Sequence, residues 1–403
     1  MIEKHPWRFK ARFRSKAYGW KGSSLAIERL KDAVSEIKNV AHTEPVAAAG
    51  GAVSLFERLW PALEHIDTSS GALGAAVYRT QEELLPLIIA APADRKTRDK
   101  WLDRLWLAIQ EDGVDYLSPV QDRWGELCAC PEVASHWADQ FVPLLRTAWS
   151  DPRPGGYARG TSLCLSSLLA ASRHQEIWDL LALARFPSWH NRRFGVEALV
   201  REGRIDAAIA YAEKTRGLNQ PDRSINAACE HILLAAGRAE EAYQHYALSA
   251  NEMPTGLATF RAISKKYPHR QPDTILQDLA KSSGDTGRYF AAAKEAGFFD
   301  LALNFAEHGR TDPRTLIRAS RDFARKQPRF AMAAGRMALE RLLQGYGYDV
   351  TTSDVLDAFR HFVAAAEVLD LTESARSEAC AMANLARQKY PGPLADALLR
   401  VIP

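Results

Sequence analysis

Apolar residues recur every three or four positions along most of the chain, which is the spacing of one buried face of an α-helix. The segment from 24 to 41 is an example, with apolar positions at Ile27, Leu30, Val34 and Ile37 and with Ser24 as the expected N-cap. Comparable stretches follow from residue 45 onward, separated by short segments rich in Gly, Pro, Asp and Ser. No pattern of strands and crossover helices interrupts them, so the sequence predicts an all-α protein.

The second half of the chain repeats itself. Four segments, 168–184, 198–214, 233–249 and 292–308, align without gaps around a small residue at a helix break: Ser172, Gly203, Gly237 and Gly297. These breaks are 31, 34 and 60 positions apart, and the last interval fits two units. A recurrence near 34 residues of helix, turn and helix is typical of tetratricopeptide-like repeats. Because one helical hairpin cannot bury its own apolar face, such units stack, and we expect an α-solenoid of antiparallel helix pairs with a concave groove.

The positions of segments rich in Gly, Pro and charged residues predict that the chain has five parts. They are a basic and aromatic N-terminal arm (1–23), an N-terminal helical region (24–150), a hinge rich in Pro and Gly (151–160), tetratricopeptide-like repeats (161–310) and a C-terminal helical capping region (311–403).

The arm has the most unusual pattern in the chain, because residues 7–16 alternate strictly between two kinds of side chain. The aromatic residues Trp7, Phe9 and Phe13 alternate with the cations Arg8, Lys10, Arg12, Arg14 and Lys16. This period of two predicts an extended ribbon. Residues 1–24 carry 7 − 1 = +6, whereas the whole chain carries +3, so the remaining residues sum to −3. The positive charge of the protein is concentrated in the arm.

Three interpretations of the arm stay open at this point. The aromatic side could dock on the helical body and leave the cations in solvent. Alternatively, the cations could follow a phosphate backbone while the aromatic rings stack on bases, as in proteins that bind single-stranded nucleic acid. The basic side could also bind an anionic protein partner.

A second candidate site lies at 187–195, where Trp189, His190, Arg192 and Arg193 cluster at the expected start of a repeat helix. Trp and Arg are enriched at the energetic centres of protein interfaces. The alternative is that Trp189 is buried between repeats and the two arginines are solvated.

Other kinds of site find little support in the sequence. The five cysteines are spread through apolar helical stretches, which is typical of buried, reduced thiols, and the C-x-C pair Cys128 and Cys130 is too close for the usual zinc spacing. No complete nucleotide-binding loop or hydrolase motif is present, so we expect no cofactor, no metal site and no catalytic residues, although an active site assembled across the fold would escape this reasoning. The chain also has no apolar run long enough for a membrane span, which favours a cytoplasmic protein.

The segments DTSSGALGAAVYRTQEELLPLIIAAP, at 67–92, and VDYLSPVQDRWGEL, at 114–127, resemble an uncharacterised bacterial helical-repeat family that often follows a SWIM-type zinc finger. The resemblance covers most of residues 25–310 and implies an α-solenoid without an established activity. A SWIM finger needs C-x-C followed by C-x-H, but here Cys128 and Cys130 are followed by Cys164 with no His two positions later. The finger is therefore absent, and no role of the finger transfers to this chain.

Together these observations predict a non-enzymatic scaffold that binds a macromolecular partner, another protein in the first instance, through its concave groove. The alternative is a nucleic-acid-binding protein that uses residues 7–21. The identity of the partner and the oligomeric state stay open.

Overall fold

The computed structural model describes residues 5–151, 158–185, 188–217 and 222–402. Over these residues the regular structure is helical, no strand is present, and successive helices pack as neighbours. The expected all-α solenoid of paired helices is therefore confirmed. The chain forms two compact units, Met1–Ile225 and Asn226–Pro403.

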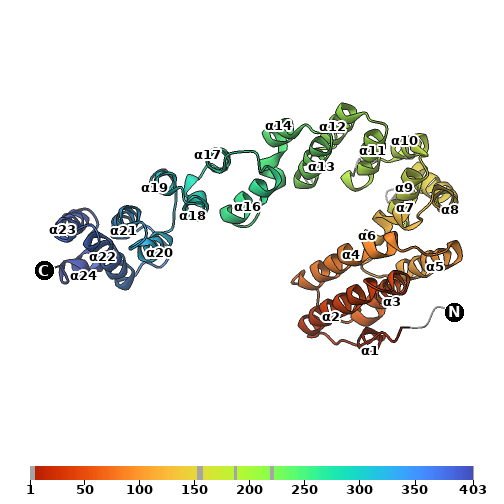
Figure 1. The fold of residues 1–403 in the computed structure, drawn as a ribbon, viewed down its shortest axis with the longest axis horizontal. Coiled ribbons are helices and arrows are strands. Elements are labelled where there is room, and N and C mark those ends of the chain that lie inside the picture. Colours follow the sequence, from red (N-terminus) through yellow and green to blue (C-terminus); the bar gives the residue numbers. More distant parts are fainter. Residues whose placement is uncertain (1–4, 152–157, 186–187, 218–221, 403) are drawn as a thin grey trace. The chain divides into compact units, whose positions relative to one another are not determined.

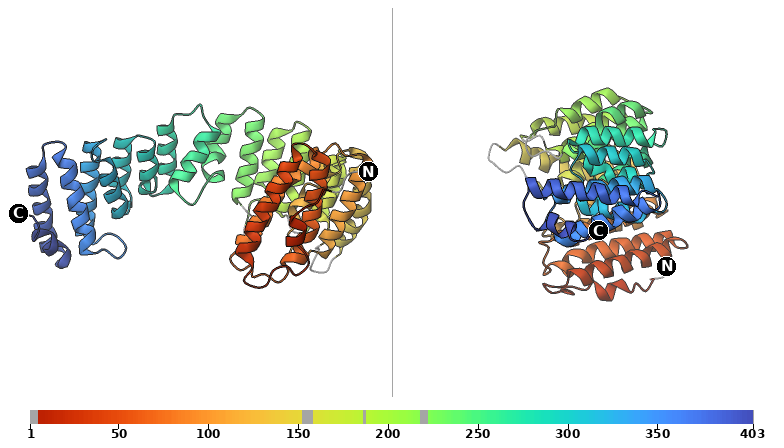
Figure 2. Two further views of the ribbon diagram at one scale, coloured as in Figure 1. Left: turned by 60° about the horizontal axis from the view of Figure 1, so that its bottom comes forward. Right: turned by 90° about the vertical axis from the view of Figure 1, so that its left-hand side faces the viewer.

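The first unit begins with long helices and continues with shorter pairs. Its elements are α1 (Phe9–Arg12), α2 (Ser23–Ala41), α3 (Pro45–Leu63), α4 (Ala72–Ala90), α5 (Arg95–Glu111), α6 (Ser118–Asp122), α7 (Trp124–Leu127), α8 (Pro131–Ser150), α9 (Thr161–Ala170), α10 (His174–Leu183), α11 (Trp189–Arg201) and α12 (Ile205–Glu213). Helices α2, α3 and α4 pack against one another, as the red and orange ribbons in Figure 2 show. Farther along, α9 packs on α10, α10 on α11 and α11 on α12.

The expected helix over 24–41 forms as α2, and its buried face contains Leu30, Val34 and Ile37. It starts one residue earlier than the sequence indicates. Gly22 is the N-cap residue, and Ser24 lies inside the first turn, so the predicted serine cap is wrong.

The second unit is a succession of helical pairs. Its elements are α13 (Asp222–Ala235), which starts at the end of the first unit, α14 (Ala239–Ala242), the π-helix η1 (Tyr243–Ala247), α15 (Leu248–Ala250), α16 (Gly256–Lys266), α17 (Pro272–Ser283), the 3₁₀ turn η2 (Thr286–Tyr289), α18 (Phe290–Glu295), α19 (Phe299–His308), α20 (Pro313–Phe323), α21 (Pro328–Leu343), α22 (Thr352–Glu367), α23 (Thr372–Lys389) and α24 (Pro393–Leu399). Within this unit, α16, α18, α20 and α22 form one row in Figure 1, and α17, α19 and α21 form the other. Neighbours within a row also touch, for example α20 with α22 and α19 with α21.

The four breaks that the sequence alignment identified are tight turns in the structure. Ser172, Gly203, Gly237 and Gly297 all adopt a left-handed backbone, with φ of 57°, 74°, 74° and 84°. Glycine adopts this conformation at little cost, which explains its recurrence there. Ser172 is the one break residue of the four that is not glycine, and its Cβ makes the positive φ unfavourable.

The division between the two units falls between Ile225 and Asn226, whereas the sequence indicated a hinge at 151–160. Of that segment, residues 152–157 lie outside the described part of the chain, and the remainder belongs to the first unit. The five-part organisation stays a prediction. In the described part of the chain, no helix combines the length and the apolar composition that crossing a membrane requires.

Candidate partner-binding site

The aromatic residues of the N-terminal arm belong to the core of the first unit. Trp7, Phe9 and Phe13 have exposed fractions of 9%, 1% and 0%. Trp7 lies directly against Gly51 of α3, where a Cβ atom would come within 2.4 Å of its indole ring. The arm is therefore docked on the helical body, and these three rings cannot stack on the bases of a nucleic acid.

The predicted extended ribbon is wrong in its secondary structure. Phe9–Arg12 forms the single turn α1, and Phe9 and Phe13 reach the core from positions four residues apart, which share one face of a helix. Ala11 and Ser15, which the alternation placed on the same side as the aromatic rings, are exposed. An alternating pattern contains the spacing of two residues that suits a strand and the spacing of four that suits a helix, and packing on α2 and α3 selects the helical one.

Side chains of α2 hold the arm in place. The carboxylate of Glu36 accepts hydrogen bonds from the backbone N–H groups of Arg8, at 2.7 Å, and Phe9, at 3.2 Å, at the start of α1. Arg12 forms an ion pair with Asp32 at 2.5 Å. A carboxylate at a helix N-terminus satisfies N–H groups that otherwise have no partner in the helix. The other arm cations, Arg8, Lys10, Arg14 and Lys16, have exposed side chains.

The residues of the second predicted cluster separate onto different surfaces, because they lie on consecutive positions of α11. Trp189 is buried, with 7% of its surface exposed. His190 and Arg193 both approach Asp122 of α6. Arg192 lies on another side of the helix, with its guanidinium 5.5 Å from the ring centre of Tyr211. The cluster is therefore not one site.

His190 and Asp122 also lie beside a serine, but their geometry differs from that of a hydrolase. Ser162 Oγ is 2.8 Å from His190 Nε2, and Asp122 Oδ1 is 3.6 Å from the same nitrogen. A catalytic triad needs the serine and the carboxylate on opposite ring nitrogens, so that one orients the ring while the other loses its proton. Burial and the charge of Arg193 lower the pKa of His190, against the opposing effect of Asp122. The imidazole of His190, on α11, is hydrogen-bonded to Ser162 of α9 and lies beside Asp122 of α6.

A groove beside Arg192 has the composition of a binding site. It lies mainly between α10 and α12, has a volume of about 460 Å³, and is lined by Trp178, Leu199, Arg204, Ala207, Ala210, Tyr211 and Lys214. Trp178 and Tyr211 meet edge to face, with ring centres 5.0 Å apart. Its only charged lining residues among those described are the cations Arg204 and Lys214.

Comparison of the repeats explains why Arg204 is available. An Arg follows the turn residue in three of the aligned segments, as Arg173, Arg204 and Arg238. Arg173 donates two hydrogen bonds to Glu176, at 2.6 and 2.8 Å, and Arg238 donates two to Glu241, both at 2.8 Å.

The residue equivalent to these glutamates in the middle segment is Ala207. Arg204 consequently has no carboxylate three positions later. It donates one hydrogen bond to Glu202, at 3.3 Å, and this carboxylate also accepts from His174 at 3.0 Å. The Arg204 side chain is 61% exposed and lines the groove. Sequence reasoning missed this residue, although the missing Glu is visible in the alignment.

In the corresponding groove of the second unit, the charged lining residues other than Lys281 have internal partners. Tyr243 occupies the repeat position of Trp178, and its hydroxyl donates to Asp278 at 2.8 Å. The guanidinium of Arg270 lies 3.6 Å from the centre of the Tyr243 ring and forms an ion pair with Glu240. Because these groups satisfy one another, this groove offers a partner fewer available charges than the groove at Arg204.

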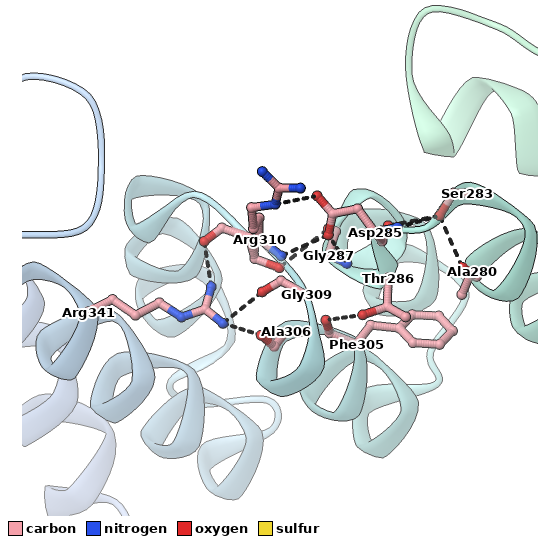
Figure 3. Close-up of polar contacts among 11 residues, drawn as sticks. Ala280, Ser283, Asp285, Thr286, Gly287, Phe305, Ala306, Gly309, Arg310 and Arg341 are labelled. Carbon is pink, nitrogen blue, oxygen red and sulfur yellow. Dashed lines mark hydrogen bonds and ion pairs between the residues drawn. The ribbon is translucent and has the colours of Figure 1, made fainter.

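A polar cluster of the second unit, drawn in Figure 3, fixes backbone turns. One oxygen of Asp285 accepts from the backbone N–H groups of Gly287, at 3.0 Å, and Arg310, at 2.7 Å. Arg341 of α21 donates to the carbonyl group of Ala306, in the last turn of α19, and to those of Gly309 and Thr311, which follow this helix. These contacts are with the backbone of the same unit, so the cluster serves the fold.

The cysteines and the acidic residues form no other candidate site in the described ranges. Cys128, Cys164 and Cys229 are buried, Cys130 and Cys380 are partly buried, and none of the five forms a disulfide. Burial raises the pKa of Cys128 and Cys164 to about 12, which keeps both thiols protonated and unreactive at neutral pH. Among the described residues, no group of three or more His, Cys, Asp or Glu is placed to hold a metal ion.

Comparison with known proteins adds no functional assignment. No family model matches the chain, and no curated protein matches it. One similar solved structure is described as a "Circular tandem repeat protein with novel repeat topology and enhanced subunit contact surfaces". It is 14% identical over 94% of this chain and 88% of its own, with a TM-score of 0.19. A TM-score this low does not define a shared fold, and the resemblance to the family found behind SWIM fingers stays a prediction.

Proposed function

We propose that this protein is a non-enzymatic helical-repeat scaffold that binds a partner protein through the surface of its repeats. The observation that carries the proposal is the groove between α10 and α12, where aromatic side chains lie beside cations that have few internal partners. Stacked helical repeats offer long surfaces whose exposed residues can change without disturbing the shared packing positions. Ala207, in place of the glutamate present in the neighbouring repeats, is such a change.

The proposal is tested by capturing partners from a native lysate with the full chain, after nuclease treatment and at two salt concentrations. The groove variant carries Arg204→Glu and Lys214→Glu. The control variant, Lys31→Glu and Arg79→Glu, reverses two exposed cations on α2 and α4 of the same unit. We expect one protein to be retained by the wild type and the control and lost by the groove variant, with unchanged helicity. Absence of any nuclease-resistant protein partner for the wild type would refute the scaffold function.

The exposed cations of the arm support a second function, the binding of nucleic acid by charge alone. Arg8, Lys10, Arg14 and Lys16 point away from the core, whereas the aromatic rings that would stack on bases are buried. Binding through phosphates weakens steeply with salt, because each neutralised phosphate releases a counterion. Replacement of these four cations by Ala leaves the docked aromatic residues in place, so it tests the charges without removing part of the core. Equal affinity of this variant and the wild type for an oligonucleotide would exclude the arm as the binding element.

A further inference from the structure

We infer that the groove between α10 and α12 binds an acidic peptide segment of the partner, with one apolar side chain of that segment seated beside Trp178 and Tyr211. This inference rests on the proposed function and specifies its ligand. The groove is identified by three properties of its lining: the sign of its charges, the apolar floor between them and the arrangement of its aromatic rings.

Charge complementarity identifies the acidic character of the partner. Arg204 and Lys214 line the groove, and Arg192 lies over the ring of Tyr211, which is one of the lining residues. In the neighbouring repeats the residue equivalent to Arg204 binds a carboxylate through two parallel hydrogen bonds. A guanidinium is well suited to this bidentate contact with a carboxylate. With Ala207 in that position, the glutamate that makes this bidentate contact in the neighbouring repeats is missing, and we assign its place to a carboxylate of the partner. Glu202 is the competing internal acid, at 3.3 Å and on one nitrogen only.

The floor of the groove identifies an apolar anchor. Leu199, Ala207 and Ala210 are the apolar lining residues besides the aromatic rings, and the small side chains of the two alanines fill little of the groove. Trp178 is fixed from behind by Gly195 of α11, because a Cβ at Gly195 would come within 2.9 Å of the indole. A volume of about 460 Å³ accommodates a side chain together with its backbone.

The arrangement of the rings favours a peptide over a nucleic-acid base. Trp178 and Tyr211 meet edge to face at 86°, so they do not form a slot between parallel faces. Arg192 also covers one face of Tyr211. Stacking of a base needs an exposed ring face, and an aliphatic side chain packs against ring edges as well as faces.

The most specific test restores the missing carboxylate. Ala207→Glu places a glutamate three residues after Arg204, as in the neighbouring repeats, and we expect it to pair with Arg204 and remove this cation from the groove. The control is Ala182→Glu, which adds the same charge at an exposed position of α10 that does not line the groove. Both substitutions are expected to leave the helicity and the unfolding midpoint of the full chain unchanged or slightly raised.

The probe is a fluorescein-labelled peptide of sequence EEEELEEEE, and binding is followed by fluorescence anisotropy at low salt. We expect saturable binding to the wild type and the Ala182→Glu control, and binding at least about fivefold weaker for Ala207→Glu and for the variant with Arg204→Glu and Lys214→Glu. The peptide EEEEGEEEE, which lacks the apolar anchor, should bind more weakly than the leucine peptide, and KKKKLKKKK and oligothymidylate should not compete.

Three results would overturn the inference. The first is that the wild type shows no saturable binding of the acidic peptide up to about 1 mM. The second is that Ala207→Glu and its control bind the peptide equally well. The third is that oligothymidylate displaces the peptide at a lower concentration than unlabelled peptide does. The lysate experiment separates this failure from that of the proposed function. If the wild type captures a partner that the groove variant loses, but the wild type does not bind the acidic peptide, the scaffold function holds and the ligand class is wrong. If neither partner nor peptide binds, both fail.

Discussion

Docking of the N-terminal arm makes a quantitative prediction about proteolysis. Residues 8–16 contain five sites for trypsin, at Arg8, Lys10, Arg12, Arg14 and Lys16, and a free arm would be cut at once. Cleavage needs an extended segment, so it requires Trp7, Phe9 and Phe13 to leave the core first. The rate of cleavage then reports the population of the undocked arm, provided that the arm redocks faster than it is cut.

Phe9→Ala is the perturbation of choice. Phe9 is 1% exposed, and truncation of a buried Phe to Ala costs about 3–5 kcal/mol. Since about 1.4 kcal/mol corresponds to a factor of ten in a population, the undocked fraction should rise about 100-fold or more. We expect the rate of tryptic loss of the arm, followed by intact mass, to rise by a similar factor until it reaches that of a free peptide.

The control is Ala11→Ser, at an exposed position of the same helical turn, which should leave the rate within about twofold of wild type because exposed substitutions have small effects. A synthetic peptide of residues 5–20 sets the upper limit. The reasoning would be refuted if the wild-type arm were cut as fast as this peptide, or if Phe9→Ala and Ala11→Ser were cut at the same rate.

Three further predictions concern stability. Gly125→Ala should lower the free energy of unfolding of the full chain, measured with urea, by about 2 kcal/mol or more, because the added Cβ would lie 2.2 Å from the carbonyl oxygen of Ser166. The control Gly74→Ala, at a position with open space, should not lower it. Tyr267→Phe should lower the free energy of unfolding by about 1–3 kcal/mol in the same assay, since it removes the hydroxyl that donates to buried Glu230 at 2.9 Å. The control Tyr348→Phe should leave it unchanged, because Tyr348 is 83% exposed. Arg314 and the backbone of Thr351 lower the pKa of Asp354 to about 2, so this carboxylate stabilises the fold above about pH 4 and the contribution is lost as the pH falls through its folded pKa. The thermal midpoint of Asp354→Asn should therefore depend less on pH than that of the wild type between about pH 4 and pH 2, and parallel curves for the two proteins would contradict this assignment.

Helical periodicity was sufficient to predict the fold because local spacing and tertiary packing agree along most of the chain. The buried positions of α2 illustrate this agreement, and so do the turns at Gly203, Gly237 and Gly297, where one residue type solves one backbone problem. The arm shows the limit of such reasoning. Phe9 and Phe13 satisfy a strand and a helical turn equally well, and only the surface of α2 and α3 decides between the two.

The candidate site was less predictable for a similar reason. Trp189, His190, Arg192 and Arg193 are close in sequence, but consecutive positions on a helix point about 100° apart, so the helix separates them. The groove brings together residues from α10, α11 and α12 that no local pattern connects. Its one signal in the sequence is the absence of a glutamate at Ala207, which becomes meaningful only when the bidentate pairs of Arg173 and Arg238 are known.

The three carbonyl groups that Arg341 binds have a consequence for how the second unit unfolds. Arg341 lies on α21, and its acceptors belong to the end of α19 and the segment that follows it. When α21 detaches, these carbonyls lose their donor and a partly buried guanidinium loses its acceptors, so the neighbouring pair of helices is weakened at the same time. In a linear array of repeats, the free energy of unfolding is the sum of the contributions of the single repeats and of the contacts between neighbouring repeats. Arg341 therefore raises the cooperativity of unfolding at this junction, and the unit should fray from its C-terminal end only as far as α22 before α19 and α21 are lost together.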